Sequence, residues 1–313
     1  MFCLWYLDRQ NVNHSPILLF SSPRSYSTVT CAMLGRHKSF YGFPELNLFL
    51  VDTIDELLNL GNGPTPYSSS YLTGLLRTIA ELKFHGQTDG KIEEARKWIT
   101  SRSHWTTKQM FDYLLDGIDG KTGIEKSPRT CLSQKSIDRA LAGYPNARII
   151  HITRHPVSTL NSLITSHQQY ADGQSFGNDA AWLANFYIRL WIRSQELILS
   201  TFRRIDRLQA FRLRGENLLS QPDHYLARLF VWLGNSLDIQ SLEAMKHPEN
   251  SPYACPAPMG MIGDGDPHFH QSPYLRILSS LEYPRSMPDW RIDASLIAKA
   301  NEIASILGYG KAF

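Results

Sequence analysis

Short apolar runs alternate along the chain with longer segments in which apolar residues recur at helical spacing. Apolar runs of this length, bounded by polar turns, are typical of strands in a parallel sheet, which is buried on both faces. Residues 17–20 have this pattern, and residues 147–153 are rich in β-branched residues. Residues 39–43, 123–128 and 209–213 are also predicted to form strands, and residues 123–128 end in a polar turn. The alternation predicts an α/β fold, a central parallel sheet flanked by helices.

The helical pattern predicts two additions to this core. The segment from about residue 53 to about residue 120 is predicted to form a helical insertion that packs over the sheet edge and shapes a substrate pocket. Residues of about 247–290 are dense in proline and glycine near their start, which predicts a loop-rich cap. A helix is also expected to begin after Pro44, with Leu46 and Leu48 in its first turns. Longer helices are predicted over residues 179–204 and 222–233 and after Asp293.

A polar turn, Ser21–Thr28, joins the first strand to the first helix. Such a junction binds anions, because the first N–H groups of a helix lack partners and the helix dipole favours negative charge there. The hydroxyl groups of the turn add donors, and Arg24 adds a permanent positive charge. We therefore predict a phosphate-binding loop, the alternative being an ordinary turn with a serine that caps the helix. The turn lacks the Gly-Lys-Ser/Thr ending of nucleotide-hydrolysing P-loops.

Polar residues also follow other predicted strands. The carboxyl ends of parallel strands lie along one edge of a sheet, where ligands bind. Glu45 and Lys126 are placed there, although a carboxylate beside a helix N-terminus and a solvated lysine are the alternative interpretations. Arg154 ends the fourth strand, and Ser162 lies two helical turns later. A guanidinium and a hydroxyl group that converge in this way suit a phosphate monoester.

The composition narrows the class of protein. Of the 313 residues, 42% are hydrophobic and 19% charged, which is typical of a globular protein. The net charge is only +3, so no nucleic-acid partner is expected. The four cysteines are widely spaced, which favours a reducing, cytoplasmic setting. The apolar segment Met1–Leu7 is read as a strand or packing arm and not as a signal peptide, and no membrane partner is expected.

The predicted cap contains a metal-like pattern. Asp264, Asp266, His268 and His270 occupy alternate positions, so they would share one face if the segment were extended. Aspartate, glycine and proline more often form turns, and no other part of the sequence completes a metal site. We therefore predict that the protein binds no metal.

Several segments together resemble a known family. The loop Pro23–Thr28 and the pair Arg154 and Ser162 resemble the phosphate-binding segments of sulfotransferases that use 3′-phosphoadenosine 5′-phosphosulfate (PAPS). Tyr26 stands where that family usually has glycine. The segment Arg214–Leu218 resembles the family's Arg-Tyr-Glu-Asp-Leu, with Gly215 in place of tyrosine and Asn217 in place of aspartate. More narrowly, segments 43–49, 125–128 and 265–270 resemble sulfotransferase domains of olefin-forming polyketide synthases.

The resemblance implies one P-loop-like sulfotransferase domain over residues 1–313 that moves a sulfuryl group from PAPS to a hydroxyl group. The implied acceptor is a small molecule or an acyl chain tethered to a carrier protein, and no metal is required. The implied PAPS-binding residues are Arg24, Ser25, Tyr26, Ser27, Thr28, Arg154, Ser162 and Arg214. Arg24 would also stabilise the leaving group, and Glu45 would be the general base, with His270 as its rival or partner.

Two other classes of function stay open at this point. A P-loop kinase of a small molecule is disfavoured by the missing Gly-Lys-Ser/Thr. A non-catalytic nucleotide-binding module is suggested by Tyr26 and by the altered segment that begins at Arg214.

Overall fold

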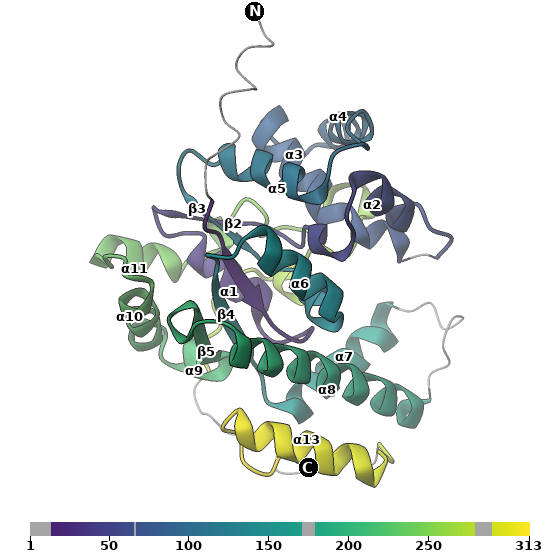
Figure 1. Cartoon of the computed structure of the whole chain (residues 1–313), viewed down its shortest axis with the longest axis vertical. Helices are drawn as coiled ribbons and strands as arrows, with labels where there is room; N and C mark the ends of the chain where they lie inside the picture. The colour runs from purple at the N-terminus through teal and green to yellow at the C-terminus, as the bar shows by residue number, and fades with distance from the viewer. Residues whose placement is uncertain (1–13, 66, 171–178, 279–289) are drawn as a thin grey trace, which may run out of the picture.

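The structure, a computed structural model, describes residues 14–65, 67–170, 179–278 and 290–313 (Figure 1). The segment Met1–Leu7 and the end of the predicted cap lie outside these residues. The centre is a parallel sheet with the strand order β2-β3-β1-β4-β5. Its strands are β1 (Ile17–Phe20), β2 (Phe40–Gly42), β3 (Thr122–Glu125), β4 (Arg148–Thr153) and β5 (Ala210–Arg214). The predicted α/β fold with a central parallel sheet is confirmed.

The strand order creates a switch point beside β1. From β1 the chain builds β2 and β3 on one side of the sheet, and then crosses to build β4 and β5 on the other side. In β1, Leu18 is paired with Glu125 of β3 and with Ile149 of β4. At such a point the loops after neighbouring strands diverge and leave a crevice at the carboxyl edge of the sheet. The predicted phosphate loop, which follows β1, lies at this crevice.

The side chains of β1 enter two separate cores. Leu18 and Phe20 belong to the core that contains the helical insertion, whereas Ile17 and Leu19 belong to the core on the other face. Successive strand residues point to opposite faces, so a strand covered by helices on both sides needs apolar residues throughout. This is why the run from Ile17 to Phe20 is apolar without interruption.

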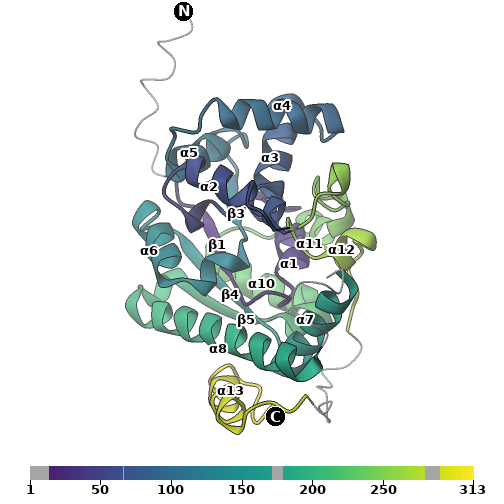
Figure 2. The same ribbon diagram turned by 90° about the vertical axis from the view of Figure 1, so that its right-hand side faces the viewer.

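The helices form layers around the sheet. In Figures 1 and 2, the insertion helices α2–α5 gather at one end of the molecule, and α13 packs beside α8 at the other. The helices are α1 (Ser27–Leu34), α2 (Ile54–Gly61), α3 (Thr73–Phe84), α4 (Asp89–Thr100), α5 (Thr107–Asp116), α6 (Gln134–Gly143), α7 (Pro156–Tyr170), α8 (Ala180–Arg204), α9 (Gly215–Ser220), α10 (Pro222–Leu233), α11 (Ile239–Met245), α12 (Pro267–Gln271) and α13 (Ala294–Ile306).

One predicted helix is wrong. After Pro44 the chain forms an irregular segment and a short 3₁₀ turn, Leu48–Leu50, and α2 begins only at Ile54. The cause is Asn47, which adopts a left-handed backbone with φ of 57° and donates its backbone N–H to the hydroxyl of Ser127. A capping box of Thr53 and Glu56 marks the true helix start. Glu45 therefore does not lie at a helix N-terminus.

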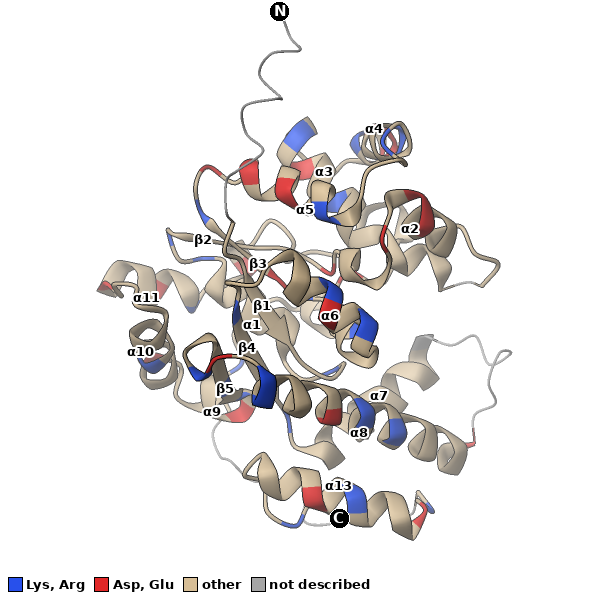
Figure 3. Cartoon of the chain, viewed as in Figure 1, with Lys and Arg blue, Asp and Glu red and all other residues tan. Residues whose placement is uncertain are grey.

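The metal-like pattern in the cap does not form an extended segment. Asp266 caps the short helix α12, so the four acidic and histidine residues do not alternate along a strand. Among the described residues, no group of three or more His, Cys, Asp or Glu side chains is arranged to hold a metal ion. Within the same residues, no helix combines the length and the apolar character that crossing a bilayer requires. Basic and acidic residues are interspersed along the helices (Figure 3).

Candidate active site

The loop between β1 and α1 has an unusual backbone. Arg24 and Tyr26 both have positive φ, 62° and 63° respectively, although neither is glycine. Left-handed residues beside right-handed ones turn successive N–H groups toward one side and create a concave anion site. The hydroxyls of Ser22 and Ser25 are 2.7 Å apart and buried, and this contact holds the turn closed. The backbone thus supports the predicted phosphate-binding role of the loop.

The structure brings three predicted phosphate ligands together. Arg24 Nε donates a hydrogen bond to Ser162 Oγ over 3.0 Å, although 138 residues separate the two. Arg154 Nη1 donates to the backbone carbonyl oxygen of Arg24, also over 3.0 Å. Arg154 Nε is buried and has no hydrogen-bond partner among the described residues. Two guanidinium groups and a hydroxyl group therefore converge where the loops after β1 and β4 meet.

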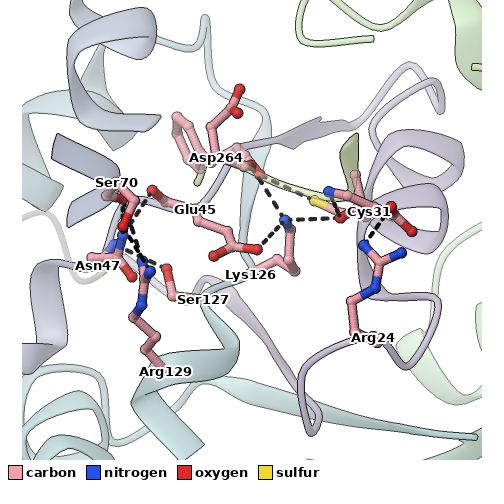
Figure 4. A network of polar contacts seen from close by, with 12 residues as sticks. Arg24, Cys31, Glu45, Asn47, Ser70, Lys126, Ser127, Arg129 and Asp264 are labelled. Atoms are coloured by element: carbon pink, nitrogen blue, oxygen red, sulfur yellow. Dashed lines mark hydrogen bonds and ion pairs between the residues drawn. The ribbon is translucent and has the colours of Figure 1, made fainter. Parts of the chain in front are cut away.

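Lys126 connects the loop to the predicted base. Its Nζ lies 3.2 Å from Thr28 Oγ1, 3.2 Å from Glu45 Oε1 and 3.5 Å from the backbone oxygen of Asp264 (Figure 4). Its side chain is only 1% exposed, so this ion pair is shielded from water. The backbone N–H of Glu45 donates to the same oxygen of Asp264, which fixes the segment that carries the carboxylate. Lys126 is a site residue for which the sequence left two interpretations.

His270 lies beside a buried ion pair. Its Nδ1 is 3.8 Å from Asp264 Oδ1, and Asp264 forms an ion pair with Arg77 of α3. Burial lowers the pKa of His270 below its ordinary value, although the Asp264 carboxylate opposes the shift, so the imidazole is neutral at pH 7. His270 lines a small separate cavity together with Lys126, whereas Glu45 lines the main pocket.

A second buried carboxylate lies at the end of β3. Glu125 is 1% exposed and accepts a hydrogen bond from the hydroxyl of Ser127. Burial raises the pKa of Glu125 to about 7, against the opposing effects of the Ser127 hydrogen bond and of Lys126. Ser127 in turn accepts the backbone N–H of Asn47. The acidic side chain thus supports the turn that presents Lys126.

The main pocket has a volume of about 710 Å³. It is lined by the phosphate loop, by Glu45, by Arg154 and Ser162, and by residues of the cap. Its other lining residues are mainly apolar or aromatic and include Leu132, Leu163, Tyr187, Leu190 and Leu219. The pocket, the predicted phosphate ligands and the Glu45 carboxylate therefore form one continuous site at the carboxyl edge of the sheet.

Arg214 is the one predicted ligand that the structure places elsewhere. It is absent from the described lining of the main pocket. Its Nη1 donates to the backbone oxygen of Gly308, and its guanidinium lies over the ring of Tyr309. These contacts attach the C-terminal segment to the end of β5. A role of Arg214 in nucleotide binding stays a prediction.

Other residues at the site gave no usable signal in the sequence. Arg77 lies in a helix without a motif, and its partner Asp264 is 187 residues away. Asp266 pairs with Arg24 at 2.5 Å, although the sequence pattern suggested only a metal ligand or a turn. Arg129 donates to both Ser70 oxygens and lies over the ring of Tyr71 at the pocket wall. Local sequence patterns do not reveal these pairs, because each pair joins segments that are distant in the sequence.

Comparison with known proteins agrees with this arrangement. Residues 16–238 match the profile of a family described as the sulfotransferase family. The fold is similar to the sulfotransferase domain from the curacin biosynthetic pathway, with 22% identity, a TM-score of 0.73, and coverage of 95% of this chain and 98% of that chain. The sulfotransferase domain from the Synechococcus PCC 7002 olefin synthase matches with 22% identity and a TM-score of 0.69 over 96% and 97% of the two chains. Curated protein sequences give no match.

At these identities the solved structures establish a shared fold. The family match is a separate finding, because it rests on the sequence and spans more than half of the chain. It includes the phosphate loop, Glu45, Lys126 and the pair Arg154 and Ser162. The chain belongs to the sulfotransferase family.

Proposed function

We propose that the protein transfers a sulfuryl group from PAPS to the hydroxyl group of an acceptor by in-line displacement. One observation carries the proposal: Arg24, Arg154 and Ser162 meet in a pocket that is also lined by the carboxylate of Glu45. The first three residues provide positions for two anionic groups, and the fourth provides a base.

The residues present fit PAPS. The buried, unpartnered Nε of Arg154 needs an acceptor, and a phosphate oxygen supplies one. Arg154 and Ser162 would hold the 3′-phosphate. Arg24, the hydroxyls of Ser25, Ser27 and Thr28, and the loop N–H groups would hold the 5′-phosphosulfate. A pocket of about 710 Å³ is large enough for a nucleotide and part of an acceptor.

The chemistry needs little beyond positioning and charge stabilisation. Bound PAPS would supply an activated sulfuryl group with a phosphate leaving group. Glu45 would take the proton of the acceptor hydroxyl while the oxygen of that hydroxyl bonds to sulfur and the bond between sulfur and the phosphate oxygen breaks. Arg24 stabilises the negative charge that develops on the departing phosphate oxygen. Lys126, 3.2 Å from Glu45 Oε1, holds the carboxylate in place. His270 is the second candidate base. Glu45 is favoured because it lines the main pocket, whereas His270 lies beside Asp264 and outside that lining.

The acceptor that the site suits best is a hydroxylated acyl chain on a carrier protein. The apolar lining of Leu132, Leu163 and Leu190 supports an alkyl chain. The similar fold of domains from the curacin biosynthetic pathway and from an olefin synthase supports a role in secondary metabolism. A free hydroxylated small molecule presents the same reacting group, so the two acceptors differ only in the tether.

Calorimetry with adenosine 3′,5′-bisphosphate and with ATP plus magnesium tests the nucleotide. We expect the bisphosphate to bind more tightly, and Arg154→Met to weaken its binding by roughly 10-fold or more. Arg212→Met is the matched control, because Arg212 also lies near a ring and bonds a backbone oxygen, but away from the pocket. Preference for ATP would contradict the proposal and favour a kinase.

Mass spectrometry of reactions with PAPS tests the acceptor. We expect a mass gain of one sulfuryl group on β-hydroxyacyl carrier protein, and a slower gain on the free hydroxy acid. Transfer to the free acid alone would exclude a carrier protein as the partner.

A further inference from the structure

Tyr26 occupies a backbone position that disfavours its own side chain. Its φ of 63° and ψ of 11° lie in the left-handed region, which a residue with a Cβ atom adopts at a cost. It is the N-cap residue of α1, yet its side chain makes no capping hydrogen bond. Glycine would fit the same backbone without strain. The tyrosine side chain must therefore contribute something that offsets this disadvantage.

The ring of Tyr26 lies against Gly215, the first residue of α9. A Cβ atom added at Gly215 would lie 2.4 Å from Tyr26 Cδ2 and 3.1 Å from both Cβ and Cγ. The distance of 2.4 Å is shorter than real Cβ contacts allow and the other two are tight, so the ring takes up the space that a side chain at position 215 would need. Gly215 has an ordinary backbone, with no positive φ. Position 215 therefore requires glycine because the Tyr26 ring leaves no room for a side chain, and not because the backbone adopts a conformation that only glycine favours.

The two departures from the family pattern in the sequence are thus one contact in the structure. The loop carries Tyr26 where the resembling family usually has a glycine, and the first residue of α9, Gly215, stands where that family has a tyrosine. The ring of Tyr26 fills the space beside Gly215.

The same ring supports Arg154. The guanidinium carbon lies 4.5 Å from the centroid of Tyr26, within the range of a cation–π contact. Arg154 Nη1 is held by the carbonyl oxygen of Arg24, two residues before Tyr26. The loop backbone and the Tyr26 side chain therefore both hold this guanidinium, while Arg154 Nε has no hydrogen-bond partner among the residues that the structure describes. Tyr26 also lines the main pocket.

We propose that Tyr26 is a positioning residue that aims Arg154 at the second phosphate of the nucleotide, and that Gly215 makes this possible by leaving room for the ring. The inference rests on the proposed function, in which Arg154 binds the 3′-phosphate. Its consequence is selectivity: Tyr26 improves binding of a nucleotide that carries a 3′-phosphate and does little for one that lacks it.

The test is calorimetry with adenosine 3′,5′-bisphosphate and adenosine 5′-monophosphate as separate probes. We expect Tyr26→Gly to weaken bisphosphate binding by roughly 2- to 30-fold, the range of a cation–π contact, and to change monophosphate binding much less. Tyr26→Gly also removes the backbone strain, so the variant is expected to fold. Tyr225→Ala is the matched control, because Tyr225 packs on the same core and lies near Arg228, but outside the described pocket lining.

A double-mutant cycle tests the contact with Gly215. We expect Gly215→Ala to displace the ring and to weaken bisphosphate binding about as much as Tyr26→Gly does. In the Tyr26→Gly background the added methyl group meets no ring, so Gly215→Ala should then have little further effect.

The outcomes separate the inference from the function beneath it. Equal losses for both probes in Tyr26→Gly would mean that the ring only supports the fold, and would overturn the inference. Additive effects in the cycle would also overturn it. If the unaltered protein does not discriminate between the two probes, the proposed role of Arg154 fails instead.

Discussion

Asp266 of the cap forms an ion pair with Arg24 of the phosphate loop, with Oδ1 2.5 Å from Nη1. The same carboxylate oxygen accepts the backbone N–H of His268 and so caps α12. The backbone N–H of Asp266 donates to Thr28 Oγ1, so the cap is attached to the loop by two contacts. The Asp266 carboxylate thus already pairs with Arg24, the residue that we propose binds the sulfuryl-bearing phosphate. An incoming anion must compete with this carboxylate for the guanidinium.

Replacing Asp266 with asparagine should strengthen nucleotide binding. Asparagine keeps the N-cap of α12 but removes the negative charge beside the anion site. We expect the dissociation constant of adenosine 3′,5′-bisphosphate to fall several-fold, as measured by calorimetry at low salt. Asp238→Asn is the control, because Asp238 also caps a helix and pairs with a cation, Lys38, at the surface. Weaker binding in Asp266→Asn would show that the carboxylate is needed to hold the loop.

Glu45 and His270 are expected to differ in their effect on turnover. If Glu45 is the general base, Glu45→Gln should lower kcat by roughly 10²- to 10⁴-fold. His270→Asn should lower kcat less, because His270 reaches the site through Asp264 and lies outside the lining of the main pocket. Steady-state kinetics of PAPS consumption measure both effects. A larger loss in His270→Asn would reverse the assignment.

Arg77 should be essential for stability. Its side chain is fully buried and pairs with Asp264, which is 3% exposed. Arg77→Met leaves the Asp264 charge buried without its partner, so we expect the free energy of unfolding to fall by roughly 3–5 kcal/mol in urea denaturation. Adding Asp264→Asn should recover part of this loss, because the uncompensated charge is then gone. Arg139→Met, at an ion pair with the exposed Asp52, should have a much smaller effect.

Glu125 should make stability depend on pH near neutrality. Its pKa is about 7 in the folded chain and lies near 4.5 when exposed, so the folded state binds more protons between these values. Stability therefore decreases as pH rises from about 4.5 to 7. Glu125→Gln keeps an oxygen for the Ser127 hydroxyl and lacks the charge. We expect this variant to exceed the original protein in unfolding free energy by roughly 2–4 kcal/mol at pH 8, and by little at pH 4.5.

Urea denaturation across this pH range measures the difference. Glu94→Gln is the control, because Glu94 is exposed and should give a difference that stays near zero. A constant difference for Glu125→Gln would mean that its carboxyl group does not titrate in this range.

The sheet could be predicted because the burial of a strand is visible in the apolar residues of that short segment alone. Ile17–Phe20 is an apolar run and Arg148–Thr153 is rich in isoleucine, and both are strands. The residues that end these runs lie at one edge by the geometry of a parallel sheet alone. Arg24, Arg154 and Ser162 were therefore found from the sequence, and the structure brings them within hydrogen-bonding distance of one another or of the loop backbone.

The remaining parts depend on contacts between distant segments. The helix expected after Pro44 fails because Ser127 draws the backbone of Asn47 into a left-handed turn. No local pattern contains that hydrogen bond, since it joins residues 80 positions apart. Arg214 matched a family segment, but its direction is set by the C-terminal residues Gly308 and Tyr309.

Lys126 illustrates what such distant contacts mean for the order in which the molecule forms. The chain up to residue 247 contains all five described strands, the phosphate loop, Glu45 and Arg77. Asp264, which contacts both Lys126 and Arg77, follows later in the chain. During synthesis from the N-terminus, the sheet can assemble while these two buried cations still await the cap. Docking of the cap, which places Asp264 beside both cations, then completes the polar contacts of the site.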